Sequence, residues 1–264
     1  MSEQVQVRER NSELTPTAQA GQAVLLHLLD WIEQVAGSAT QPVVVFDLDS
    51  TLYHTDQRHL TIFSEFIEHH HPNDPVLRAA FHELGKNGYI WSPMHELRRL
   101  QVGDDALIHS LAHYWRERFF SNEYLRHDLP VPGAPEYVRA CHDRGAFCYY
   151  LTGRTRSLME EGTRASLYQH GFPMDSRTYL HMKQKKTDDD LRFKLDAAPP
   201  LRALGQVLGI FENEPANLNG LSEAFPEALA VFLDTICMPL APPLAPHVVK
   251  IQSFELPEWV DLSP

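Results

Sequence analysis

The chain has 264 residues, 43% hydrophobic and 22% charged, which suits one large globular domain or a core domain with an insertion. Its 23 basic and 35 acidic residues give a formal net charge of −12, which excludes nonspecific binding to nucleic acid through a basic surface. No apolar run approaches the ~20 residues that span a bilayer, and the amino end lacks the apolar stretch of a secretory signal. The three cysteines form no C-x-x-C pair. We therefore expect a cytoplasmic protein without a membrane partner.

The amino end is predicted to be disordered and then helical. Residues 1–14 are mostly polar and charged, which favours disorder. Thr15-Pro16 has the form of an N-cap followed by proline in the first turn of a helix. Apolar residues then recur at helical spacing as far as Ala36, and Pro42 marks the start of the next element.

A buried strand with two acids at its end comes next. Residues 43–46 read VVVF, typical of a strand covered on both faces in a parallel sheet. Residues 47–51 follow at its carboxyl end, where open α/β sheets bind ligands. The carboxylates of Asp47 and Asp49 repel each other unless a cation or a proton lies between them. This loop is therefore the first candidate for chemistry; the alternative is a turn that merely ends the strand.

The stretch from Tyr53 to Pro132 is predicted to be wholly helical. Its apolar residues form stripes at helical spacing, without sheet-type alternation. The stripes run over residues 60–67, 77–84 and 106–120. We therefore expect a helical insertion over residues 53–132 and a core formed by residues 15–52 and 133–264.

After residue 132, strands and helices alternate. Strands are predicted at residues 147–151, 178–180, 207–211 and 228–233, with a further edge strand at 248–251. Helices are predicted between them, including one over residues 195–204. This alternation predicts an α/β fold with a doubly wound parallel sheet and right-handed crossovers.

Polar residues occupy the ends of two further strands. Thr152-Gly153-Arg154 offers a hydroxyl and a backbone amide beside a glycine, which suit a phosphate oxygen; the alternative is an ordinary capped turn. Glu212 and Asn213 offer oxygen ligands for a hard cation such as Mg²⁺; the alternative is a helix start enriched in acids.

A cation is needed to offset the charge of a phosphoryl group beside these carboxylates. Lys194, which stands at the opening of the predicted 195–204 helix, is the preferred candidate. Lys185 and Lys186 remain alternatives, although they belong to a basic run that most simply forms a solvated loop.

These motifs, in this order, resemble those of the haloacid dehalogenase superfamily from about residue 43 to residue 235. Asp47 to Thr51 is similar to its first motif, Thr152 to Arg154 to its second, Lys194 to its third and Glu212-Asn213 to its fourth. The resemblance implies a Rossmann-like core, a movable helical cap inserted after the first motif, and Mg²⁺-dependent transfer through an aspartyl-phosphate. Asp49 marks the phosphatase and phosphotransferase branches, which differ in this from the dehalogenases.

The resemblance also implies roles for individual residues. Asp47 is expected to be the nucleophile and Asp49 the general acid and base. Thr152, Gly153 and Lys194 are expected to bind phosphate. The expected metal ligands are Asp47, Asp49, Glu212 and Asn213, although the superfamily usually has aspartates in its fourth motif.

Two residues of the predicted insertion are possible substrate contacts. His54 and Arg58 follow the nucleophile loop closely and could face the space under a cap; exposure to solvent is the alternative for both. The run His69-His70-His71 is better explained as a helix end than as a zinc site.

The sequence thus predicts a Mg²⁺-dependent phosphatase that acts on a small phosphorylated metabolite. A phosphotransferase differs only in the acceptor. The altered fourth motif also allows a catalytically weak binding or regulatory relative. Neither the substrate nor the oligomeric state can be read from the chain, because cap residues carry no recognisable code.

Overall fold

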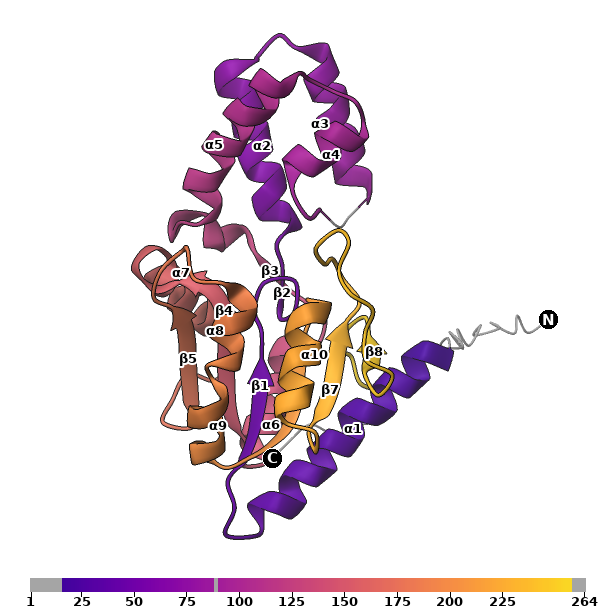
Figure 1. Cartoon of the computed structure of the whole chain (residues 1–264), viewed down its shortest axis with the longest axis vertical. Coiled ribbons are helices and arrows are strands. Elements are labelled where there is room, and N and C mark those ends of the chain that lie inside the picture. Colours follow the sequence, from indigo (N-terminus) through magenta and orange to yellow (C-terminus); the bar gives the residue numbers. More distant parts are fainter. Residues whose placement is uncertain (1–15, 88–89, 258–264) are drawn as a thin grey trace, which may run out of the picture.

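A six-stranded parallel sheet forms the centre of the molecule. The computed structural model describes residues 16–87 and 90–257. The strands are β1 (Pro42–Phe46), β4 (Phe147–Thr155), β5 (Thr178–Lys183), β6 (Gln206–Glu212), β7 (Leu229–Leu233) and β8 (Val249–Ile251). They lie in the order β5-β4-β1-β6-β7-β8, and every neighbouring pair is parallel. The predicted doubly wound sheet is confirmed (Figure 1).

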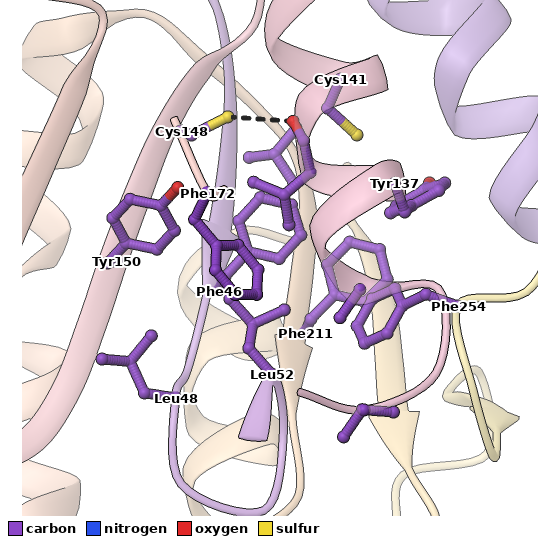
Figure 2. Packing of buried hydrophobic residues seen from close by; sticks show 14 of the residues in the cluster. Phe46, Leu48, Leu52, Tyr137, Cys141, Cys148, Tyr150, Phe172, Phe211 and Phe254 are labelled. Carbon is purple, nitrogen blue, oxygen red and sulfur yellow. Dashed lines mark hydrogen bonds between the residues drawn. The ribbon is translucent and has the colours of Figure 1, made fainter. Parts of the chain in front are cut away.

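Helices cover both faces of this sheet, because successive residues of a strand point to opposite sides. One face packs against α1 (Pro16–Ala36), α6 (Ala134–Asp143) and α7 (Arg156–Gln169); the other packs against α8 (Asp190–Leu195), α9 (Ala198–Leu204) and α10 (Pro215–Ala224). Val44 and Phe46 belong to the first core cluster, whereas Val43 and Val45 belong to the second. Figure 2 shows Phe46 among the aromatic side chains of the first cluster.

A helical segment, residues 56–119, lies beyond the carboxyl ends of the strands (Figure 1). Its helices are α2 (Asp56–His70), α3 (Pro75–Asn87), α4 (Pro93–Arg99) and α5 (Asp105–Phe119). They enclose a hydrophobic cluster of their own that includes Phe63, Phe66 and Leu111. The segment therefore has a core separate from the two that flank the sheet.

Short strands join this segment to the sheet domain, which differs from the prediction of an all-helical stretch. β2 (Tyr53–His54) pairs antiparallel with β3 (Leu129–Pro130), which follows a 3₁₀ helix, η1 (Glu123–His127). Two-residue strands are too short to show the alternation that identifies a strand in a sequence. The pair brings the outgoing and returning chains together.

Other element boundaries in the structure also differ from the predicted ones. The predicted helix 195–204 is two helices, α8 and α9, with Lys194 in the last turn of α8 rather than at a helix opening. β4 extends to Thr155, beyond the predicted end at residue 151. The prediction of disorder at residues 1–14 lies outside the described residues. Within residues 16–87 and 90–257, no helix is long and apolar enough to cross a membrane.

A buried histidine connects two helices of the helical segment. His59 of α2 stacks on Phe119 with ring centroids 4.5 Å apart, and its Nδ1 accepts a hydrogen bond from Trp115 Nε1 at 3.0 Å. Burial, with the nearby charge of Arg58, lowers the pKa of His59 to about 3. The imidazole is therefore neutral in the folded protein at neutral pH.

We predict that His59 makes folding stability depend on pH. The unfolded chain protonates this histidine below about pH 6.5, whereas the folded chain does not until about pH 3. Stability should therefore fall as pH falls through that window, by up to ~1.4 kcal/mol per pH unit. Urea unfolding of wild type and His59→Phe at pH 7 and pH 5 measures this contribution, and an equal loss in both proteins would contradict it.

We also predict that Gly133, at the start of α6, cannot be replaced by alanine without loss of stability. Its φ is +77°, and an added Cβ would lie 2.6 Å from backbone atoms of Phe254 and Glu255. Left-handed backbone costs an L-residue about 1–2 kcal/mol, so Gly133→Ala should lower the free energy of unfolding by at least that amount. Gly85→Ala is the control: Gly85 is helical with no atom within 4 Å of an added Cβ, and the change should stabilise by about 0.5–1 kcal/mol.

Candidate active site

Three adjacent strands bring the polar motifs to one edge of the sheet. Asp47 follows β1, Thr152 lies in β4 and Glu212 ends β6, and β1 lies between β4 and β6. All three residues line a cavity of about 1160 Å³. Its opposite wall comes from α4 and α5 of the helical segment, including Trp115. A small organic molecule would fit between the strand ends and the helices.

The loop after β1 has a fixed and unusual backbone. Asp47 N–H donates to Phe211 O at 3.0 Å, which extends the pairing of β1 with β6. Ser50 has a φ of +61°, a left-handed conformation that costs a non-glycine residue energy and that clusters at functional sites. Thr51 Oγ1 donates to Asn213 Oδ1 at 3.1 Å. The first and fourth motifs are thus bonded to each other.

Lys194 lies between two buried carboxylates. Its Nζ donates to Asp47 Oδ1 at 2.7 Å and also to Glu212 Oε2. Burial disfavours a charged lysine, but these two carboxylates raise the pKa of Lys194 above its usual value. Lys194, rather than Lys185 or Lys186, is therefore the lysine that the structure brings to Asp47.

The environment of Asp47 favours its protonated, neutral form. Burial raises the pKa of Asp47 to about 7; Lys194 opposes this rise, and the charge of Glu212 adds to it. Two carboxylates and one ammonium group leave one net negative charge at this edge. A second cation would keep both carboxylates ionised.

The two glutamates at the end of β6 point in different directions. Glu212 Oε1 accepts hydrogen bonds from the backbone N–H groups of Asn213 and Glu214, at 3.1 and 3.0 Å. The Glu214 carboxylate instead accepts from Met238 N at 3.0 and 3.1 Å. Asn213 Nδ2 donates to Ile236 O at 2.6 Å. Glu212 is therefore directed toward Asp47 and Lys194, and Glu214 toward the loop after β7.

The donor atoms suit a hard cation. Among residues 16–87 and 90–257, no three acidic, histidine or cysteine side chains form a ready metal cluster. Asp47 and Glu212 nevertheless place two carboxylates around the single ammonium group of Lys194, so one negative charge has no partner in this cluster. Mg²⁺ takes oxygen ligands, often from only one or two carboxylates, and keeps several waters. The residues present fit it.

The second motif lies within β4 and lines the cavity. Thr152 Oγ1 accepts a hydrogen bond from Arg154 N at 3.3 Å. At Gly153, an added Cβ would lie 2.8 Å from Asp190 Oδ1, so glycine allows α8 to approach this strand. Asp190 in turn is ion-paired with Lys183 at 2.7 Å.

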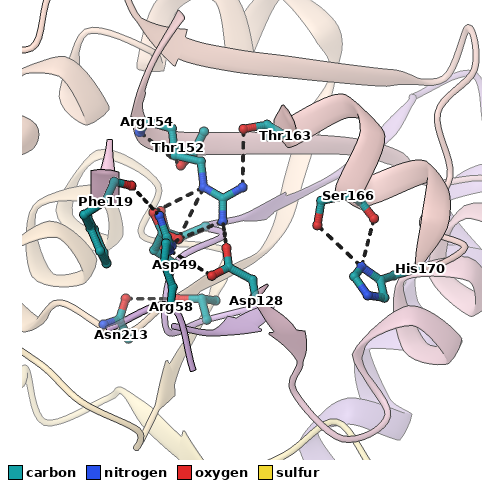
Figure 3. A network of polar contacts seen from close by, with 12 residues as sticks. Asp49, Arg58, Phe119, Asp128, Thr152, Arg154, Thr163, Ser166, His170 and Asn213 are labelled. Atoms are coloured by element: carbon teal, nitrogen blue, oxygen red, sulfur yellow. Dashed lines mark hydrogen bonds and ion pairs between the residues drawn. The ribbon is translucent and has the colours of Figure 1, made fainter. Parts of the chain in front are cut away.

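Asp49 takes part in a network of two arginines and two aspartates (Figure 3), in which the Asp49 side chain is partly exposed and the other three are buried. Its Oδ1 accepts from Arg154 Nη2 at 2.7 Å and from Arg58 Nη2 at 2.5 Å. Asp128 bridges the same guanidinium groups at 2.9 and 2.8 Å. Burial alone would raise the pKa of Asp49, but Arg154 and Arg58 hold it well below its usual value. In this arrangement Asp49 is ionised.

Arg58 and His54 do not lie where a substrate contact was expected. Neither is among the described residues that line the cavity. Arg58 is fully buried, with its guanidinium 4.0 Å from the centroid of the Phe119 ring. His54 lies in β2, where partial burial lowers its pKa.

Sequence reasoning missed Asp128 and His59. Asp128 pairs with Arg58, 70 positions earlier in the chain, and with Arg154, 26 positions later. His59 lines the cavity beside Trp115. No local motif marks either residue. Both follow other polar residues in the sequence, so neither stands out from its neighbours.

Comparison with known proteins agrees with this geometry. A family model described as haloacid dehalogenase-like hydrolase matches residues 42–191. A HAD-superfamily hydrolase of subfamily IA, variant 1, from Geobacter sulfurreducens has a TM-score of 0.51 at 13% identity, with 83% of this chain and 94% of that chain covered. A candidate phosphatase from Clostridium difficile has a TM-score of 0.50 at 12% identity, with 74% and 86% covered.

At these identities, the two structures show a common fold and nothing further. No protein with a curated function matches the sequence significantly. The family model, however, spans more than half of the chain and includes the loop after β1 and the second motif in β4. The chain therefore belongs to the haloacid dehalogenase-like hydrolases.

Proposed function

We propose that the protein is a Mg²⁺-dependent phosphatase that hydrolyses a small phosphorylated metabolite through an aspartyl-phosphate. The observation that carries the proposal is the position of Asp47: its carboxylate is bonded to Lys194, lies near Glu212 and opens onto a large cavity. A carboxylate nucleophile beside a fixed ammonium group suits attack on a phosphoryl group, whose charge must be offset as it is transferred.

The residues around Asp47 take complementary roles in this proposal. A carboxylate oxygen of Asp47 attacks phosphorus, the bond to the ester oxygen breaks, and the alcohol leaves with a proton from Asp49. Water activated by Asp49 then hydrolyses the aspartyl-phosphate and releases inorganic phosphate. Thr152, Gly153 and Lys194 hold the phosphoryl oxygens, since all three line the same cavity. Positioned cations and backbone dipoles stabilise the charge that develops at such a centre.

Mg²⁺ would be held by the carboxylates of Asp47 and Glu212 and by the main-chain carbonyl of Asp49, with Asn213 beside them. When bound, it would neutralise charge on the phosphoryl group. Asn213 contributes indirectly, because its amide group bonds both Thr51 and the backbone of residue 236 and so joins the first and fourth motifs.

Asp49 is proposed as the general acid and then the general base. It lies two residues from Asp47 and lines the same cavity. Its pairing with Arg58 and Arg154 suits the base role, because an ionised carboxylate can activate water. The acid role requires that one of these pairs be loosened when substrate binds.

The helical segment is proposed to act as a cap, within an insertion of residues 53–132. Support comes from its separate hydrophobic core, its position over the strand ends and its contribution of one wall to the cavity. Closure of such a segment excludes water and completes a substrate pocket.

The cytoplasmic location stays a prediction.

One observation favours a second candidate. The fourth motif supplies only one carboxylate to the centre, because Asn213 is neutral and Glu214 is directed to Met238. A protein with weakened metal binding could bind a phosphorylated ligand without turning it over. Mg²⁺-dependent release of p-nitrophenolate from p-nitrophenyl phosphate separates the enzyme from this binding relative.

Asp47→Asn is predicted to abolish turnover while the fold persists. The amide keeps the shape and a hydrogen-bond acceptor for Lys194 but is not a nucleophile, so kcat should fall by more than ~10³-fold. Phosphate release is the measurement, with circular dichroism and urea unfolding as the check on folding. Wild-type rates in a folded Asp47→Asn protein would reject the mechanism.

Glu212→Gln is predicted to weaken Mg²⁺ binding, whereas Glu214→Gln is its matched control. Glu212 is directed to Asp47, so its loss should raise the Mg²⁺ concentration for half-maximal rate by ~10-fold or more, the scale of losing a partner at a metal site. Glu214 bonds a backbone amide elsewhere, so its replacement should change that concentration little. The reverse order in a Mg²⁺ titration would show that the ligands are exchanged.

Asp49→Asn is predicted to affect substrates unequally. Loss of general acid catalysis should slow esters with alkoxide leaving groups by about 10²–10⁴-fold. Release of p-nitrophenolate needs little protonation and should be slowed less. Comparison of an alkyl phosphate with p-nitrophenyl phosphate measures this, and equal losses would argue against the acid role.

A further inference from the structure

We propose that the cavity binds a second anionic group of its substrate, a carboxylate or another phosphate, between Arg116 of α5 and Lys186 of the loop between β5 and α8. This inference rests on the proposed phosphatase function and adds a substrate class to it: phosphate monoesters that carry a second negative charge. Arg116 and Lys186 would be specificity-determining residues, separate from the residues around Asp47.

The first argument is the distribution of charge on the cavity wall. The described cationic residues that line it are Arg98, Arg116, Arg154, Lys183, Lys186 and Lys194. Three of these are ion-paired with neighbouring carboxylates. The other three, Arg98, Arg116 and Lys186, form no ion pair with any described residue. Of these, Arg116 and Lys186 are close enough for the charge of one to act on the other.

The second argument is that these two cations lie near each other although they belong to different parts of the fold. Arg116 lies in the last turn of α5, and Phe120 directly follows that helix. Lys186 Nζ lies 4.1 Å from the centroid of the Phe120 ring. Burial lowers the pKa of Lys186, and the positive charge of Arg116 lowers it further.

Two neighbouring like charges repel each other and are destabilising unless an anion lies between them. An anion at this position would contact the helical segment through Arg116 and the sheet domain through Lys186. Guanidinium groups bind carboxylate and phosphate oxygens in bidentate geometry, and an ammonium group adds a point charge. The pair is thus complementary to a second anionic group rather than to an apolar or neutral one.

The aromatic residues beside the pair define the rest of the substrate contact. Trp115 and Phe119 are stacked with centroids 4.5 Å apart and line the same cavity. They can cover an apolar linker between the two anionic ends. A substrate of this kind would have its ester phosphate at Asp47 and its second charge at Arg116.

The structural alternative is that Arg116 only complements the dipole at the carboxyl end of α5, where Arg118 also lies. Cations at helix carboxyl ends are stabilising by about 0.3–1 kcal/mol. This alternative accounts for Arg116 but not for Lys186, which belongs to a loop of the sheet domain. It predicts an effect on stability and none on substrate choice.

The test compares ω-carboxyalkyl phosphates with alkyl phosphates of the same chain length, in the presence of Mg²⁺, with α,ω-alkanediol bisphosphates as a third arm. For at least one length, wild type should prefer the doubly anionic ester in kcat/KM by on the order of tenfold, the effect of one charge-assisted contact. The third arm shows whether carboxylate or phosphate is the preferred second group.

Variants then locate the contact. Arg116→Gln and Lys186→Gln should each reduce the ratio of kcat/KM between the charged and uncharged esters toward one. Lys185→Gln and Arg99→Gln are the controls. Lys185→Gln removes the exposed charge next to Lys186, and Arg99→Gln removes an exposed arginine of the helical segment; neither residue lines the cavity, so each variant should keep the ratio. A wild-type ratio near one, or a ratio that Arg116→Gln and Lys186→Gln leave unchanged, would overturn the inference.

Failure of the proposed function gives a different result. If no ester is hydrolysed, the phosphatase proposal is wrong, and calorimetry with ω-carboxyalkylphosphonates and alkylphosphonates decides the second site alone. Tighter binding of the carboxylated compounds that is lost in Arg116→Gln and Lys186→Gln supports the site. Equal binding of the two series overturns it.

Discussion

The site depends on one ammonium group between two buried carboxylates. Removing an unpaired carboxylate from water costs several kcal/mol. Asp47 and Glu212 share Lys194 as their ion-pair partner. One negative charge is left over, and burial together with the charge of Glu212 raises the pKa of Asp47. In the proposed function, Asp47 is the nucleophile, Lys194 is the phosphate-binding cation, and the remaining negative charge at the carboxyl ends of β1 and β6 is met by a further cation. A hydrophobic replacement of Lys194 would leave both carboxylates without an ion-pair partner.

The network around Asp49 uses the same interaction for a different purpose. Its two guanidinium groups and two carboxylates cancel in charge, and Arg58, Arg154 and Asp128 are completely buried side chains. Loss of one member of such a network costs about 3–5 kcal/mol. Because Arg58 belongs to α2 and Arg154 to β4, the network joins the helical segment to the sheet domain through Asp49. A neutral cluster of this kind maintains geometry, whereas the charged cluster around Lys194 is the one that we propose to bind ligands.

The sheet and the motif edge could be predicted because both are local. Residues 43–46 show a buried strand directly, and parallel strands necessarily bring their carboxyl ends to one side. The environment of Arg58 could not be predicted, because its partner Asp128 lies 70 residues later in the chain. The same holds for the choice of Lys194 over Lys185 and Lys186, which only the packing of α8 against β4 decides. Local pattern indicates which residues can do chemistry, whereas long-range pairing decides which of them do.

The charges that line the cavity also bear on how a ligand would move the helical segment relative to the sheet domain. A ligand moves the helical segment only by as much as its affinity differs between the open and closed arrangements. A phosphate that contacts only Lys194, Thr152 and Asp47 touches the sheet domain alone and supplies little of that difference. A second anionic group between Arg116 and Lys186 would touch both parts and relieve the repulsion between them, so it would favour closure directly. On this argument, substrate choice and closure have the same physical origin, which is the pair of uncompensated cations where the helical segment meets the sheet domain.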